Sequence, residues 1–166
     1  MLGQTQNAIL QKVESDVESK VKPQHQESFK RVVMLGLRAM HSKQSHDYMV
    51  SVIQQSGGSP EKIAEGVIRL LGLMINKSKN TMLGPEVAPV LFSAAQILLC
   101  EALDFMEQAG QIKVTNETVA ESTKALSSYY LQLLGVSPQK LQGMLNKVSA
   151  GKAKPQGIIG AAQGGA

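Results

Sequence analysis

The chain has 166 residues, of which 43% are hydrophobic, 18% are charged and 4% are aromatic, and its formal net charge is +4. This length suits one hydrophobic core. The few aromatic residues argue against binding of single-stranded nucleic acid by base stacking, and the single cysteine excludes a disulfide within the chain.

The first predicted element is a thin amphipathic helix over residues 4–21. Ile9, Val13, Val17 and Val21 recur at a spacing of four, which places them in one narrow apolar stripe. A stripe of this width buries little surface within its own chain. We therefore expect residues 1–22 to form an N-terminal helical arm that is held by a neighbouring chain rather than by the core.

Three further helices are predicted over residues 24–42, 45–55 and 60–76. The first of them carries a dense run of apolar side chains between Phe29 and Met40. The third has a clear start at Ser59 and Pro60, because serine caps a helix and proline loses nothing at its first position. A polar connection with a Gly84-Pro85 break follows.

The most apolar segment covers residues 87–106. Apolar side chains occur around its whole circumference, which is typical of a helix that is buried on every side. A membrane span is the alternative, but its uninterrupted part is shorter than the roughly 20 residues that a bilayer requires, and Glu101 and Asp104 would lie inside it. We predict the central helix of a bundle, in which the buried residues are Leu91, Ala95, Leu98, Leu99 and Ala102.

Two more helices are predicted over residues 116–134 and 138–148, and a tail rich in glycine and alanine follows over residues 149–166. Ordering such a tail costs roughly 1 to 2 kcal/mol per residue, more than burial of Ile158 and Ile159 returns. We expect other chains to hold it. The sequence thus predicts an all-α fold: a single bundle of six or seven helices over residues 23–148, an N-terminal helical arm and an extended C-terminal tail.

No catalytic, cofactor-binding or metal-binding residue is predicted. Cys100 lies in an apolar run, which favours a buried thiol over a nucleophile. His41 and His46 are five residues apart and so face different sides of a helix, unlike a pair of zinc ligands. Glu101 and Asp104 share a helix face and could in principle run acid–base chemistry, but no nucleophile or basic partner follows them, so an exposed acidic stripe is expected.

The charges are segregated along the chain. The net charge is +4 over residues 1–85, −5 over residues 86–121 and +5 over residues 122–166. Blocks of opposite sign steer one copy of a protein toward another, although charges spread over solvated faces would give the same counts. Contact with nucleic acid is a further alternative, through Lys20, Lys22, Lys30, Arg31, Arg38, Lys43, Lys152 and Lys154.

Helices rich in methionine and glutamine, an arm at one end and the tail GIIGAAQGGA at the other resemble small virion proteins of tailed bacteriophages, including internal and ejection proteins. The resemblance is one of composition and layout over the full length. It implies a non-enzymatic structural subunit, packed in many copies with other structural proteins of the same particle. It also implies a role in assembly or DNA ejection, without a cofactor or a small-molecule substrate.

Two other functions stay open on the sequence. One is a membrane-active ejection or pore-type protein, and the other is a helical nucleic-acid-binding regulator. The start of the chain has no basic region followed by an apolar stretch, which predicts that there is no signal peptide. We therefore expect the protein to be made in a cytoplasm. The resemblance implies that this is the cytoplasm of the host and that the protein is located in the virion; otherwise we expect a cytoplasmic protein.

Overall fold

The computed structural model describes residues 5–135, apart from the side chains at positions 44, 45, 48, 49, 52, 53 and 56. This part of the chain is all-α and has no strand, which confirms the all-α character that the sequence predicts. Its α-helices are α1 (Ala8–Lys20), α2 (Gln26–Met40), α3 (Lys43–Ser56), α4 (Pro60–Lys77), α5 (Leu91–Gln108) and α6 (Asn116–Leu133). Short 3-10 helices lie at η1 (Pro23–His25), η2 (Thr81–Leu83) and η3 (Ala88–Val90).

The chain divides into two compact units at Tyr130. The first unit holds the core and the sites discussed below. Of the second unit, the structure describes the end of α6 and a turn at Gly135, whose φ of 74° suits glycine. The helix expected over residues 138–148 and the tail over residues 149–166 lie outside the described residues and stay predictions.

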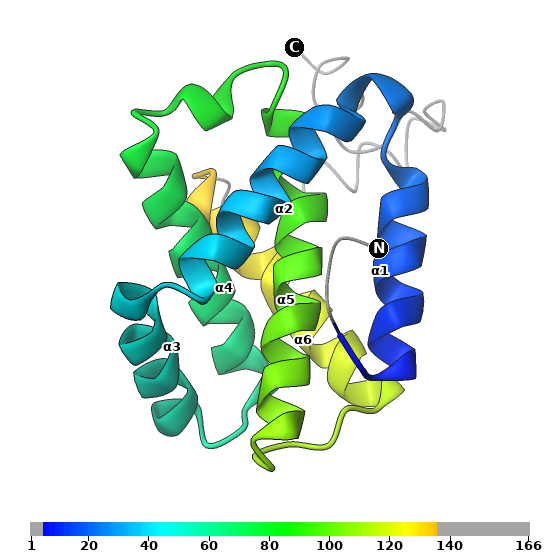
Figure 1. Ribbon diagram of the computed structural model, residues 1–166, viewed down its shortest axis with the longest axis vertical. Helices are drawn as coiled ribbons and strands as arrows, with labels where there is room; N and C mark the ends of the chain where they lie inside the picture. The colour runs from blue at the N-terminus through cyan, green and yellow to red at the C-terminus, as the bar shows by residue number, and fades with distance from the viewer. Residues whose placement is uncertain (1–4, 136–166) are drawn as a thin grey trace, which may run out of the picture. The chain divides into compact units, whose positions relative to one another are not determined.

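Helix α5 is the centre of the first unit. It packs against α1, α2 and α4, and Figure 1 shows it between α1 and α4 with α2 crossing it. The predicted buried residues Leu91, Ala95, Leu98, Leu99 and Ala102 are all buried. A helix that is apolar around most of its circumference is thus buried over most of it, as its sequence predicts.

A glycine allows α2 to approach α5 closely. Gly36 is buried on α2, and a Cβ added there would lie 2.5 Å from Leu98 Cδ1 on α5. Only a residue without a side chain leaves the room that Leu98 occupies. The crossing of the two helices therefore depends on this pair.

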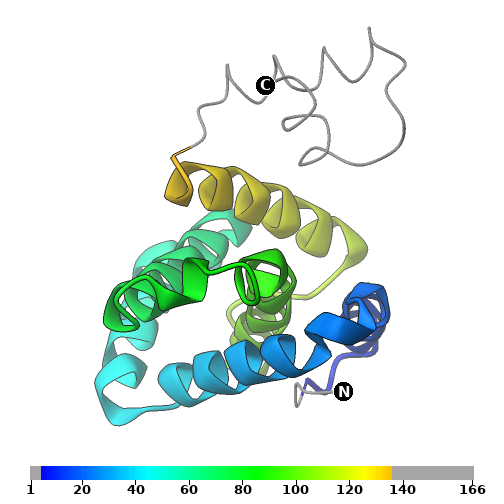
Figure 2. The ribbon, with the colours of Figure 1, turned by 90° about the horizontal axis from the view of Figure 1, so that it is seen from above.

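The expectation that the first helix is an arm rather than part of the core is wrong. Helix α1 packs against α5 of its own chain, and Leu10, Glu14 and Val17 form its buried face. Figure 2 shows α1 beside the rest of the bundle from above. The sequence pattern missed this face because Glu14, a carboxylate, lies in its middle.

In the part of the chain that the structure describes, one helical segment is long and apolar enough to cross a membrane. It runs from Ala88 to Gln108, which includes α5. Most of it is buried inside the protein. The core helix of a bundle has the same length and composition, so these two properties alone do not distinguish the two roles.

Candidate functional site

A group of carboxylates lies where α1 meets α5. Glu14 of α1 is fully buried, and Glu101 and Asp104 of α5 are 9% and 4% exposed. The exposed acidic stripe expected at Glu101 and Asp104 is therefore wrong. Helix α1 and the residues before it cover this side of α5, a contact between segments about 100 residues apart.

Asp104 and Glu107 form hydrogen bonds with the segment before α1 and with the loop after α5. One Asp104 oxygen, Oδ1, accepts hydrogen bonds from the backbone N–H groups of Gln6 and Asn7, both at 3.1 Å, and Oδ2 accepts one from Gln108 Nε2. Glu107 accepts one from Asn7 Nδ2 at 2.7 Å and one from the Val114 N–H at 2.8 Å. These bonds tie the segment before α1 and the loop after α5 to the end of α5. The role they support is structural.

Asn7 links these carboxylates to the start of α1. Its side-chain oxygen accepts hydrogen bonds from the N–H groups of Ile9 and Leu10, so Asn7 is the N-cap of α1. An N-cap of this kind satisfies donors that the first turn of a helix leaves without partners. The start of α1 is therefore fixed both to its own helix and to α5.

Glu14 differs from the other carboxylates in this group. Its Oε2 accepts a hydrogen bond from Thr5 Oγ1 at 3.1 Å, while its buried Oε1 has no partner among the described residues. The pKa of Glu14 is raised from 4.5 to about 7, mainly because the carboxyl group is buried. The Thr5 hydrogen bond lowers this pKa, and the nearby charges of Glu101, Glu18 and Asp104 raise it. Glu14 therefore carries its proton up to neutral pH.

Glu101 also borders a small cavity, which residues of α2, α3 and α5 line. The cavity measures about 20 Å³ and is also lined by His41, His46 and Phe105. The rings of His46 and Phe105 lie edge to face, with their centroids 6.5 Å apart. A space of this size holds about one water, far less than the roughly 300 Å³ of a small ligand pocket.

The thiol of Cys100 is buried, as the sequence predicts. Burial raises its pKa well above the ordinary value, and the charges of Glu14 and Glu101 raise it further. A thiol in this state is a poor nucleophile, because the thiolate is the reactive form.

We expect a thiol-reactive probe at neutral pH to label native Cys100 about 100-fold more slowly than the unfolded chain, since labelling must wait for an opening of the fold. The rate is measured by mass spectrometry with and without denaturant. Rapid labelling of the native protein would show that Cys100 is accessible and would contradict the assignment of a buried, unreactive thiol.

The basic residues considered for nucleic-acid contact lie on the surface. Those in the described part of the chain, at positions 20, 22, 30, 31, 38 and 43, are all exposed. On α2 they do not form a continuous basic face, because the exposed apolar side chains of Met34 and Leu35 lie among them and Arg31 pairs with Glu27 at 3.2 Å. Within the described residues, no cluster of three or more histidine, cysteine or acidic side chains could hold a metal ion.

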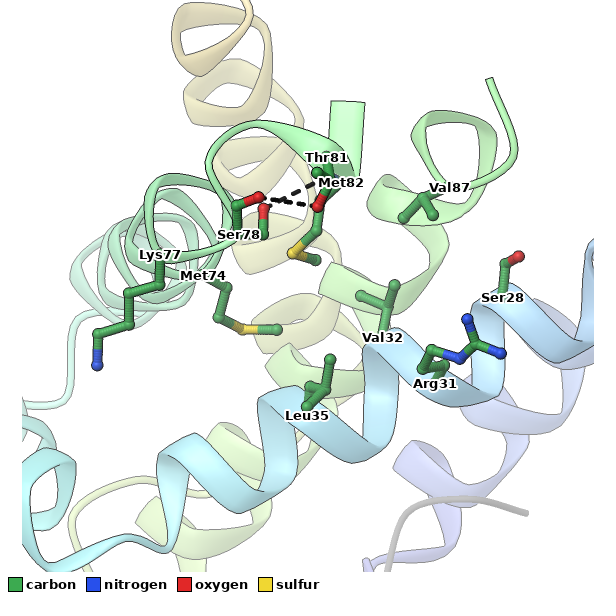
Figure 3. A pocket seen from close by; sticks show the side chains of 10 residues that line it. All are labelled: Ser28, Arg31, Val32, Leu35, Met74, Lys77, Ser78, Thr81, Met82 and Val87. Carbon is green, nitrogen blue, oxygen red and sulfur yellow. Dashed lines mark hydrogen bonds between the residues drawn. The ribbon is translucent and has the colours of Figure 1, made fainter. Parts of the chain in front are cut away.

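An apolar groove lies between α2, the end of α4 and η2. Its volume is about 540 Å³, and Figure 3 shows the side chains that line it. The apolar lining consists of Val32 and Leu35 of α2, Met74 of α4, Met82 of η2 and Val87, with Arg31 and Lys77 at the edges.

The polar groups in the groove are already bonded within their own turn. Ser78 Oγ donates a hydrogen bond to Ile75 O at 2.7 Å, and Thr81 Oγ1 donates one to Ser78 O at 2.8 Å. The groove therefore offers an incoming chain mainly apolar contacts. Of the two basic side chains at its edges, Arg31 is paired with Glu27, so the preference for negative charge comes mainly from Lys77.

Large apolar side chains are exposed on the same elements. Met34 and Leu35 of α2 are 43% and 46% exposed, Leu73 of α4 is 51% exposed, and Leu83 of η2 is 44% exposed. This surface was not predicted from the sequence. The available signal was the run Val32-Val33-Met34-Leu35, since four consecutive apolar residues on a helix cannot all face one core.

Comparisons with models of protein families, with curated proteins and with solved structures found no match. Any inference about function therefore comes from the geometry of the molecule itself. Two features carry it: the carboxylate group between α1 and α5, and the groove with the exposed apolar side chains around it.

Proposed function

We propose that the protein is a non-enzymatic structural subunit that assembles in multiple copies. The observation that carries this proposal is the apolar groove between α2, α4 and η2, together with Met34, Leu35, Leu73 and Leu83 exposed on the same elements. An apolar groove whose elements also expose large apolar side chains is typical of a contact with another protein. The side of α2 and α4 that carries the groove is exposed at these side chains and is available for such a contact.

The occupant that we propose for the groove is the start of α6 in a second copy of the chain. Glu101 and Asp104 are buried, so they do not contribute to the acidic surface that the block 86–121 presents. Glu117 and Glu121 remain exposed and lie four residues apart on one face of α6. Their charge is complementary to Lys77 at the edge of the groove, and to Arg31 if it exchanges its exposed pair with Glu27 for the new contact.

A contact of this kind joins two different surfaces of the same protein. Such head-to-tail contacts close into rings when the rotation between subunits allows it, and otherwise form filaments. The resemblance to small virion proteins of tailed phages supports a place in such a particle. We therefore propose a virion component of the internal, ejection or head–tail region, with other structural proteins of the particle as its further partners.

Replacement of Leu35 by lysine tests the groove. The substitution removes apolar contact area and adds a positive charge where only half of the side chain is covered, so the fold should persist while association weakens at least tenfold. The native mass is measured over a range of protein concentrations, with circular dichroism as a check on folding.

Ser15→Lys is the matched control, because Ser15 is exposed on α1 and remote from the groove in sequence. It should associate like the parent. Glu117→Lys combined with Glu121→Lys should weaken association as well, if a second copy is the occupant. Equal association of the parent and the Leu35→Lys variant would refute the groove as the contact.

A membrane-active ejection protein is the second candidate, and the segment from Ala88 to Gln108 favours it by length and composition. Because most of this segment is buried, the bundle would have to open before it could enter lipid. Flotation of the full chain with lipid vesicles tests this candidate. Co-flotation would support it, and protein left at the bottom of the gradient would refute it.

A further inference from the structure

We propose that α1 is a pH-gated element: the proton on Glu14 keeps α1 docked on α5, and loss of that proton releases α1 together with the segment Thr5–Asn7. The proposal does not depend on the assembly function proposed above. It depends on the position of one carboxyl group between two helices.

The Glu14 side chain lies at the centre of the contact. It is fully buried between Leu10 and Val17 on the inner face of α1. A neutral carboxylic acid suits this place, because Thr5 donates to one oxygen and the other has no partner among the described residues. An ionised carboxylate there would be a buried charge that only the Thr5 hydrogen bond compensates, which is costly.

The groups around Glu14 make ionisation still less favourable. Glu101 and Asp104 face it from α5, and Glu18 lies one turn further along α1. The Cys100 thiol of α5 is also close enough to interact with it. Among the described residues, the charged groups that act on Glu14 are all acidic.

The contacts among α2, α3, α4 and α5 do not involve α1. The main packing partner of α1 is α5, whereas α5 also packs against α2 and α4. The segment before α1 is held by Asp104 and Glu107, so it would lose these bonds when α1 moves. The Gly36 and Leu98 contact between α2 and α5 would remain.

The direction of the pH effect follows from linkage. The pKa of Glu14 is about 7 in the docked state and returns to its ordinary value of 4.5 when α1 is released into water. Docking is therefore strongest below pH 4.5 and is lost progressively as the pH rises from 4.5 through 7. This shift corresponds to a change of about 100-fold in the equilibrium between released and docked α1 from pH 4.5 to pH 8.

Hydrogen exchange of the full chain, measured by mass spectrometry and corrected for the intrinsic effect of pH, tests the proposal. In the parent, the protection of peptides from α1 should fall about 100-fold between pH 4.5 and pH 8. Glu14→Gln keeps an oxygen for the Thr5 hydrogen bond and cannot ionise, so its α1 peptides should keep their protection. Asp16→Asn, a change at an exposed site on the same helix, should behave like the parent.

Three outcomes would overturn the proposal. The first is an equal fall in protection in the parent and in Glu14→Gln. The second is constant protection of α1 in the parent. The third is a parallel loss of protection in α1 and α5, which would show that Glu14 governs unfolding of the whole bundle. If Glu14→Gln does not fold, Glu14→Leu replaces it, since leucine of similar volume suits an apolar site.

Discussion

Replacement of Leu98 by aspartate is expected to prevent folding. Leu98 is fully buried in the middle of α5 and fills the space that Gly36 of α2 leaves open. The change removes about 1.5 to 3 kcal/mol of apolar burial and adds a buried charge without a partner, which costs several kcal/mol more. Together these losses approach the total stability of a typical domain, about 5 to 15 kcal/mol.

The measurement is the yield of folded protein and its thermal melt, followed by circular dichroism. Leu73→Asp is the matched control, because it makes the same change on a helix at a side chain that is 51% exposed, and it should fold. Leu98→Met keeps the volume of the side chain and should cost less than about 1.5 kcal/mol. A Leu98→Asp protein that melts like the parent would contradict the central place of α5.

Replacement of Asp104 by alanine is expected to lower the free energy of unfolding by about 3 kcal/mol. The change removes the acceptor for the N–H groups of Gln6 and Asn7 and for the side chain of Gln108. Donors that lose their partners in a buried place cost about 1 to 3 kcal/mol each. Three donors lose their acceptor, but water can replace part of the lost bonds once the segment before α1 moves away. The total loss of stability should therefore be near 3 kcal/mol, the upper value for a single donor.

Urea denaturation measures this change. Asp104→Asn is the control, because its amide keeps one oxygen for the two backbone N–H groups and its NH2 group can face Gln108, whose amide can turn. The asparagine variant should therefore lose about half as much stability as the alanine variant or less. Equal losses in both variants would show that charge, rather than the hydrogen bonds to Gln6 and Asn7, makes Asp104 important.

The order of the helices and the place of α5 could be predicted because both depend on local patterns. Apolar side chains around the whole of residues 87–106 require burial on every side, whatever the partners are. The start of α4 could be predicted for the same kind of reason, since Ser59 caps it and accepts a hydrogen bond from the Lys62 N–H. Neither prediction needs knowledge of the rest of the chain.

The carboxylates could not be placed in this way. Glu14, Glu101 and Asp104 look solvent-facing in the sequence, because an acidic residue is seldom buried without a partner. Their burial depends on contacts across almost the whole described chain, such as the bonds from Gln6 and Asn7 to Asp104. The arm was misplaced for this reason: with Glu14 counted as exposed, the buried face of α1 looked too narrow to pack on its own core.

The groove is a further feature that the sequence did not reveal. It forms because α2, α4 and η2 meet at angles that leave Leu35, Met74 and Met82 around a common space. The sequence contained only the hint that Met34 and Leu35 extend an apolar run beyond what one face of a helix can bury. The charge blocks of the sequence indicated contact between copies. However, the acidic block includes Glu101 and Asp104, which are buried in the fold.

The mass of the native particle in solution tests the central claim most directly. A structural subunit that docks on further copies through its groove should give, at about 10 μM protein and low salt, a mass that is a multiple of the 17.8 kDa of one chain. That mass should fall toward one chain in the Leu35→Lys variant. A single particle of 17.8 kDa at every concentration up to about 100 μM would contradict the claim.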